Sequence, residues 1–145
     1  MMYVIPIEFA TPAYDQTIAL RDRILRQPLG LDFKPKDLSQ EFAYTHLACY
    51  HEDGRLLGCL TMVPLNDQRV KMQQVAVAET WQRKGVGKQL VAASEVYAQK
   101  AGFDCIELNA RDIAIPFYEK LNYQKVGKPF TEVSIKHYKM EKLLS

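Results

Sequence analysis

The sequence predicts an α/β (α+β) fold in which a mixed, mostly antiparallel sheet of six to seven strands is flanked by about four helices. Two strand-like runs, 43–50 and 55–63, are joined by a turn that contains Asp53-Gly54, a dipeptide favoured in tight hairpins. A further strand-like run is followed by a glycine-containing turn and then by apolar residues at helical spacing. The length of 145 residues suits one core, so we predict a single domain over residues 1–145.

The N-terminal part is predicted to contain a strand, a helix and a loop. Residues 3–9 alternate weakly between apolar and polar types, as strand residues do. Thr11-Pro12 supplies a cap and a first-turn signal for a helix that reaches about Arg26. The segment 27–40 carries two prolines and a glycine, so it is predicted as a loop with at most a short helix, of the kind that borders a binding site.

The rest of the chain alternates strands and helices. A turn at 64–67 leads into a strand at 68–78. Apolar residues recur at helical spacing over 86–101, and Gly102 ends that helix. The remaining predicted elements are a strand at 105–109, a helix at 112–121, and strands at 123–127 and 133–140.

Composition limits the classes of function. The net charge is +2 with basic residues scattered among acidic ones, so no nucleic-acid surface is expected. No stretch is long and apolar enough to cross a bilayer, and Pro6 and Glu8 interrupt the first apolar run, so we predict a cytoplasmic protein without a signal peptide. Cys49, Cys59 and Cys105 are odd in number and widely spaced, which favours buried reduced thiols over a metal site or a disulfide.

The segment with the most chemical information is Gln82-Arg83-Lys84-Gly85-Val86-Gly87-Lys88, which lies between a predicted strand and a predicted helix. The first backbone N–H groups of a helix have no intrahelical partner and suit phosphate oxygens. Two glycines allow close approach of a ligand and unusual dihedral angles, and three cations supply compensating charge. A phosphate-bearing ligand is the first hypothesis, and a helix start on a solvated basic face is the alternative.

Two better-known phosphate loops do not fit this segment. A P-loop needs a glycine five residues before Gly-Lys-Ser/Thr, whereas position 82 is Gln and Gly87-Lys88 is followed by Gln89. The dinucleotide fingerprint needs glycine or alanine at position 90, which is Leu, and an acidic residue at the end of the next strand, where only Glu107 is available.

The remaining pattern, Gln-x-x-Gly-x-Gly between a strand and a helix, resembles the acetyl-coenzyme A loop of the GNAT family of N-acetyltransferases. The resemblance covers most of the chain from about Ala43 onwards. Gln74-Val75-Ala76-Val77 is similar to the fourth strand of that family. The segment 114–123 resembles its Ala-x-x-Phe-Tyr-x-x-x-Gly-Phe motif, with Asn122-Tyr123 in place of Gly-Phe.

The resemblance implies a GNAT fold and an acyl-CoA-dependent N-acetyltransferase that uses acetyl-CoA and no metal. In the family, N–H groups of the loop bind the pyrophosphate, and N–H groups of the fourth strand polarise the thioester carbonyl. The coenzyme-binding residues implied by this match are Gln74, Val75, Ala76, Val77, Gln82, Arg83, Lys84, Gly85, Val86, Gly87, Lys88, Asn109, Phe117 and Tyr118.

The resemblance also implies how protons are managed. Tyr118 matches the tyrosine that protonates the departing thiolate, and a phenol of pKa ~10 can give a proton to a thiolate whose acid lies near ~8.5. A core tyrosine is the alternative. Gln73 stands where many members carry a basic glutamate, so the usual base is absent. Substitute bases are Glu107, and Glu132 and His137 in a segment that resembles the Glu-x-x-Ile-x-His-x-x-Met ending of one branch of small bacterial acetyltransferases.

Several alternatives stay open at this stage. The same coenzyme-binding residues would suit two other kinds of protein. One is a module that binds coenzyme A without acyl transfer, and the other is an acyltransferase for a longer acyl group. A small-molecule amine is favoured over a protein acceptor, because the chain has no acidic run that would attract a lysine-rich tail. The sequence leaves the oligomeric state open, a homodimer included. Asn122 is expected to take the left-handed conformation at a helix end, and His46 and His51 are expected to be structural or exposed.

Overall fold

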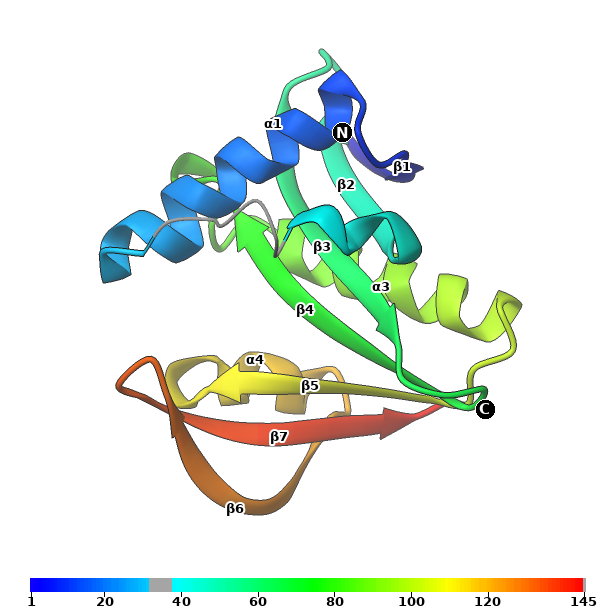
Figure 1. The fold of residues 1–145 in the computed structure, drawn as a ribbon, viewed down its shortest axis with the longest axis vertical. Helices are drawn as coiled ribbons and strands as arrows, with labels where there is room; N and C mark the ends of the chain where they lie inside the picture. Colours follow the sequence, from blue (N-terminus) through cyan, green and yellow to red (C-terminus); the bar gives the residue numbers. More distant parts are fainter. Residues whose placement is uncertain (32–37, 145) are drawn as a thin grey trace. The chain divides into compact units, whose positions relative to one another are not determined.

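The computed structural model describes residues 1–31 and 38–144. Its strands form one mixed sheet in the order β1-β2-β3-β4-β5-β7-β6 (Figure 1). β4 and β5 pair in parallel, and the pairs β1–β2, β2–β3, β5–β7 and β6–β7 are antiparallel. The predicted mixed, mostly antiparallel sheet is thereby confirmed. The strands are β1 (Met2–Ile7), β2 (Thr45–His51), β3 (Leu56–Pro64), β4 (Arg69–Val77), β5 (Cys105–Arg111), β6 (Gln124–Glu132) and β7 (Ile135–Leu143).

Three α-helices have both ends within the described residues: α1 (Pro12–Arg21), α3 (Val86–Lys100) and α4 (Ile115–Lys120); Leu38 and Ser39 are helical as well. The predicted first helix does reach Arg26, because α1 continues as a π-helical turn over Asp22–Arg26. Residues 32–37, the centre of the predicted loop 27–40, lie outside the described residues.

The predicted cap of α1 is confirmed. Thr11 has an extended backbone, its hydroxyl accepts a hydrogen bond from the Tyr14 N–H at 3.3 Å, and Pro12 occupies the first turn. This geometry fixes where α1 begins, because the cap satisfies one of the N–H groups that lack a partner in the first turn.

The chain forms two compact units, one of Met1–Val63 with Met72–Val96 and the other of Pro64–Lys71 with Tyr97–Ser145. In the first unit, α1 and α3 contact neighbouring residues of β3, whose side chains alternate between the two faces of the sheet. A Cβ on Gly58 would lie 2.8 Å from Val86 in α3, so only glycine permits this approach. Cys59 packs instead with Leu20 of α1.

In the second unit, β5, β7 and β6 form the sheet and α4 follows β5. Apolar residues of β5 alternate with polar ones: Ile106 and Leu108 are buried, whereas Glu107 is half-buried and Asn109 exposed. After α4, Asn122 takes a left-handed φ of 72°, as the sequence predicts for this helix end. The predicted buried thiols are also confirmed, since the three cysteines of the sequence are free and buried.

The last hairpin differs from the predicted one. β6 extends to Glu132, and the turn lies at Val133 and Ser134, which have φ angles of 52° and 60°. The predicted strand 133–140 therefore begins at Ile135 instead. Two left-handed residues make a tight hairpin turn, but neither is of the Asn-Gly type that marks such a turn in a sequence.

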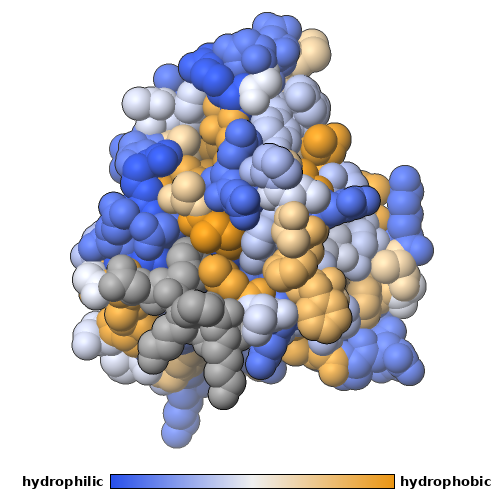
Figure 2. All heavy atoms as spheres, turned by 45° about the horizontal axis from the view of Figure 1, so that its top comes forward, coloured by the Kyte–Doolittle hydropathy of each residue, from blue (hydrophilic) through white to orange (hydrophobic). Residues whose placement is uncertain are grey.

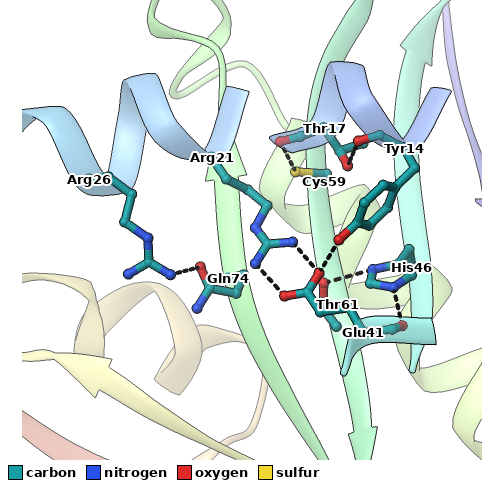
Figure 3. Close-up of polar contacts among 9 residues, drawn as sticks. All are labelled: Tyr14, Thr17, Arg21, Arg26, Glu41, His46, Cys59, Thr61 and Gln74. Carbon is teal, nitrogen blue, oxygen red and sulfur yellow. Dashed lines mark hydrogen bonds and ion pairs between the residues drawn. The ribbon is translucent and has the colours of Figure 1, made fainter. Parts of the chain in front are cut away.

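A buried polar network joins α1 to the segment before β2 (Figure 3). The guanidinium of Arg21 donates two hydrogen bonds of 2.7 Å to the two carboxylate oxygens of Glu41. The Tyr14 hydroxyl donates to the same carboxylate at 2.8 Å. Nε2 of His46 donates to the Glu41 carbonyl at 2.9 Å, which leaves Nδ1 to accept from the Thr61 hydroxyl at 3.1 Å. His46 is thus buried and structural, as predicted.

Replacing Glu41 by Gln is expected to lower the free energy of unfolding by about 3–5 kcal/mol, because the Arg21 charge would stay buried without its counter-ion. Urea denaturation followed by circular dichroism measures the change. Asp53→Asn is the matched control, since Asp53 pairs with Arg55 at the surface and its loss should change the midpoint little. A Glu41→Gln variant with the wild-type midpoint would contradict a structural role for the pair.

Acidification is expected to destabilise the fold in two stages. Burial lowers the pKa of His46 below its ordinary 6.5, more than the neighbouring Glu41 raises it. Burial alone would raise the pKa of Glu41, but the hydrogen bonds and charge of Arg21 outweigh it and hold the pKa below 4.5. Both groups therefore bind protons more readily in the unfolded chain.

Their contributions are complete above the unfolded pKa values and are lost as the pH falls through the folded ones. The urea midpoint should decline as the pH falls below about 6.5 and again below about 4.5, with the upper stage absent in His46→Gln. A midpoint that stays constant down to about pH 5, or a full upper stage in the variant, would contradict this assignment.

Candidate functional site

The predicted site residues fall into two groups, one in each unit. In the first unit, β4 is followed by a short 3-10 helix at Glu79–Trp81, and the segment 82–88 then leads into α3. Gly85 has a φ of 87°, and the Gln89 N–H donates to the Gly85 carbonyl at 3.0 Å, so the helix starts directly after this left-handed residue. Gly87 lies inside the first turn of α3 and has no positive φ. The backbone conformation therefore does not require glycine here, and what glycine offers at this position is the absence of a side chain.

Two contacts fix this loop against its surroundings. The Gln82 side-chain amide donates to the carbonyl of Val77, the last residue of β4, at 3.1 Å. Two cations lie over the Trp81 ring, Lys84 at 5.4 Å and Arg55 at 5.5 Å from its centroid. Charge and aromatic face attract at such distances. The loop is thus tied both to β4 and to the β2–β3 turn.

The loop presents positive charge and backbone donors together. Arg83, Lys84 and Lys88 are exposed. The first N–H groups of α3 have no acceptor within the helix, and the helix dipole adds positive potential at this end. The arrangement suits a phosphate or pyrophosphate group.

The segment Gln74–Val77 forms the end of β4. Gln74 has a φ of 56°, an unusual value for a non-glycine residue inside a strand and typical of a bulge. Its side-chain oxygen accepts a hydrogen bond from Arg26 at 3.2 Å (Figure 3). Ala76 is buried, whereas Val75 and Val77 are half-buried. The backbone of this strand end is therefore held in a specific, strained conformation.

In the second unit, Tyr118 lies on α4 and is buried. Its ring meets those of Phe117 and Tyr123 edge-on, at centroid distances of 4.9 and 5.7 Å. Burial raises the pKa of Tyr118 to about 12, so the hydroxyl keeps its proton at neutral pH. Phe117 itself is 37% exposed.

Glu107 on β5 belongs to a cluster of charges. Its carboxylate lies 3.3 Å from Arg69 and 3.4 Å from Lys139, and Arg69 also pairs with Glu141 at 2.9 Å. Glu107 and Glu141 are direct cross-strand partners, and two like charges in that position repel unless a cation bridges them. Arg69 does so, and Glu107 is thereby committed to ionic pairing.

His137 on β7 has a different environment. It is buried, stacks on Phe130 at 5.7 Å, and places Nδ1 2.8 Å from the Ile135 carbonyl oxygen. A carbonyl only accepts, so Nδ1 carries a hydrogen, and in the neutral ring the lone pair is then on Nε2. An imidazole fixed in this tautomer can accept a proton at Nε2. Glu132, by contrast, is exposed at the end of β6, and Asn109 is exposed on β5 opposite Lys139.

Tyr118 and His137 belong to opposite faces of this sheet. Lys142 of β7 lies over the Tyr123 ring at 5.7 Å, and Tyr123 contacts Tyr118. Side chains alternate along a strand, so His137 points away from the face that carries Lys142. Within this unit the structure thus separates the predicted acid from the predicted bases.

Sequence reasoning missed three interactions near these residues: the Arg21–Glu41 network, the Arg26–Gln74 hydrogen bond, and the stacking of Lys84 and Arg55 on Trp81. Each joins residues that are distant in the sequence, apart from Trp81 and Lys84. Only the latter spacing was available as a local signal.

The described residues contain no group of three or more His, Cys, Asp or Glu side chains placed to hold a metal ion. Among those same residues, no helix has the length and apolar character needed to span a membrane. Hydrophobic side chains on the face shown in Figure 2 lie in patches separated by hydrophilic ones.

Comparison with known proteins finds a protein family whose model matches most of the chain. A family model described as "Acetyltransferase (GNAT) domain" matches residues 24–144. YvbK of Bacillus subtilis (strain 168), described as an uncharacterized N-acetyltransferase, is 36% identical over 108 residues, which are 74% of this chain and 66% of that protein.

Solved structures agree with this match. A presumed N-acetyltransferase from Lactobacillus plantarum has a TM-score of 0.85 and 26% identity, with 99% of both chains covered. A GNAT family acetyltransferase from Elizabethkingia anophelis, solved with acetyl-CoA bound, has a TM-score of 0.75 with 99% of this chain and 98% of that chain covered. Its identity of 15% makes it a likeness of fold alone.

The two loop glycines are expected to respond differently to substitution by alanine. Gly85→Ala should lower stability by about 1 kcal/mol, because alanine is strained at positive φ, although its Cβ would meet no atom within 4 Å. Gly87→Ala lies at a helical position and carries no such penalty. Urea denaturation of both variants measures the contrast, and an equal loss in both would contradict the loop conformation.

Proposed function

Because the chain belongs to the GNAT acetyltransferase family, we propose that it transfers an acetyl group from acetyl-CoA to a primary amine by direct attack, with Tyr118 as general acid. The matching family model is that of GNAT acetyltransferases, and a GNAT family acetyltransferase of the same fold has been solved with acetyl-CoA bound. The observation that carries the proposal is the loop 82–88, where a left-handed Gly85 opens α3 next to exposed cations.

The pyrophosphate of acetyl-CoA would lie against this loop. Its oxygens would accept hydrogen bonds from N–H groups between Arg83 and Lys88, and the nearby cations would offset the charge. The contacts of Gln82 with Val77 and of Lys84 with Trp81 restrain the loop, which reduces the loss of conformational freedom on binding.

The thioester carbonyl would meet backbone N–H groups between Val75 and Val77. As the amine nitrogen attacks the carbonyl carbon, the oxygen gains negative charge, and fixed N–H donors stabilise that charge without reorganising. The strained backbone at Gln74 supports this role, because strained residues persist where the surrounding structure holds them for a function.

Two protons then have to move. The C–S bond breaks and the sulfur of coenzyme A takes a proton from the Tyr118 hydroxyl, while the attacking nitrogen loses a proton to a base. A pKa of about 12 makes Tyr118 a weak acid beside a thiol of ~8.5, a gap of about 5 kcal/mol. A thiolate that leaves into the same apolar surroundings is itself destabilised by desolvation, which narrows the gap.

We assign the base to His137 in preference to Glu107 or Glu132. Its Nε2 lone pair is left available by the hydrogen bond at Nδ1, whereas Glu107 is paired with two cations and Glu132 is exposed.

The acceptor in this proposal is a small-molecule amine. Basic and acidic residues are interspersed along the chain, and no acidic run is present that would attract a lysine-rich protein tail. Release of the coenzyme A thiol, followed with a thiol reagent across a panel of amines, tests the proposal. Propionyl and succinyl thioesters in the same assay test the acyl group.

Tyr118→Phe is expected to lower kcat by about 100-fold and to change the Kd for acetyl-CoA by no more than about twofold. The change removes one hydroxyl from a buried ring and leaves the 82–88 loop intact. Tyr3→Phe is the matched control, because Tyr3 is an exposed tyrosine on β1. Wild-type turnover by Tyr118→Phe would contradict the acid assignment.

The bases are separated in the same assay. His137→Gln is expected to lower kcat by about 10- to 100-fold, and Glu132→Gln to leave it within about twofold. The reverse order would move the base to Glu132. Binding of acetyl-CoA without turnover of any amine by the wild-type protein would instead favour a module that binds coenzyme A without transfer.

A further inference from the structure

The π-helical turn Asp22–Arg26, which continues α1, makes one contact with β4 and one with the segment that follows β4. Arg26 donates to the Gln74 side chain at 3.2 Å, and Arg23 pairs with Glu79, just beyond the end of β4, at 3.1 Å. The two contacts thus bracket the strand end Gln74–Val77 (Figure 3 shows Arg26 and Gln74).

The conformation of Gln74 needs such support. Its φ of 56° lies in the left-handed region, which costs a non-glycine residue roughly 1–2 kcal/mol. Strain of this kind persists only where neighbouring groups hold it. The hydrogen bond from Arg26 is charge-assisted and partly buried, so it restrains the Gln74 side chain more strongly than a neutral bond at the surface would.

A π-helical turn is itself informative. Its hydrogen bonds span five residues instead of the four of an α-helix, and such turns are found frequently at functional sites. Here it ends α1 in such a way that the Arg26 guanidinium reaches the strained residue of β4. The Arg23–Glu79 pair is exposed and contributes less, because solvent screens it.

We propose that Arg26 is a positioning residue, which acts through Gln74 to orient the backbone N–H groups of Val75 to Val77 toward the thioester oxygen. This inference rests on the proposed function. The dihedral angles of Gln74 set the direction of the peptide groups that follow it. Loss of Arg26 therefore weakens the stabilisation of the negative charge that develops on the thioester oxygen during the reaction. It does not weaken the binding of the pyrophosphate at 82–88.

A double-mutant cycle tests this proposal with the full chain. Arg26→Met and Gln74→Met are each expected to lower kcat about tenfold and to change the KM for acetyl-CoA less than about twofold. The double variant is expected to lose about tenfold as well, because both changes break one interaction. Arg26→Lys keeps a donor and should recover part of kcat. Lys128→Gln, which removes an exposed charge on β6, is the control for net charge.

A readout without turnover keeps the proposal separate from the proposed function. Amide hydrogen exchange at residues 75–77 is expected to be about tenfold faster in Arg26→Met than in the wild type, with exchange in α3 unchanged. Faster exchange throughout the first unit would mean that the variant loses its fold, and would overturn a local role. Unchanged exchange, an additive hundredfold loss in the double variant, or wild-type kcat in Arg26→Met would overturn it as well.

Failure of the proposed function has a different signature. If the wild-type protein turns over no amine while Arg26→Met still shows faster exchange at residues 75–77, the restraint of β4 by Arg26 is supported and the proposed acetyl transfer is contradicted. If the wild-type protein is active and Arg26→Met matches it in both turnover and hydrogen exchange, the acetyl transfer is supported and the positioning role of Arg26 is contradicted.

Discussion

The buried ion pair between Arg21 and Glu41 determines the position of α1 in the first unit. Arg21 and Glu41 are 2% and 5% exposed, so each charge depends on the other for its stability. Because the pair fixes the last turn of α1, it also fixes where the π-helical turn starts and where Arg26 meets Gln74. The ion pair near the end of α1 is thereby connected to the end of β4, which we propose to lie at the reacting carbonyl.

The two halves of the proposed reaction depend on different kinds of structure. Phosphate binding needs backbone N–H groups and a left-handed residue, which the start of α3 and Gly85 supply. Proton transfer needs side chains in defined protonation states. Burial raises the pKa of Tyr118, which is neutral at pH 7 in any case, and the Ile135 carbonyl holds a hydrogen on Nδ1 of His137. Among the described residues, neither side chain has an ionic partner that would compete for its proton.

Local patterns in the sequence predicted most of the fold. Thr11 and Pro12 marked the start of α1, Asp53-Gly54 marked the first hairpin, and Asn122 took the left-handed conformation expected of it. The turn at Val133 and Ser134 was not predicted, because neither residue type favours a positive φ and tertiary pairing of β6 with β7 imposes it.

The candidate site was only partly accessible from sequence. The loop 82–88 and Tyr118 could be found because their residues follow one another closely. Arg26 and Gln74 are 48 residues apart, and no local pattern links them. The choice among the three bases likewise depended on their partners: cations at Glu107, solvent at Glu132 and a carbonyl at His137.

The central claim is that the loop between β4 and α3 binds the pyrophosphate of acetyl-CoA. Calorimetric titration of the wild-type protein and of a Gly85→Val, Gly87→Val double variant with acetyl-CoA tests it most directly. We expect saturable binding at one site per chain in the wild type, weakened at least about tenfold in a variant that remains folded by circular dichroism. Equal affinity of both proteins, or no binding to either, would contradict it.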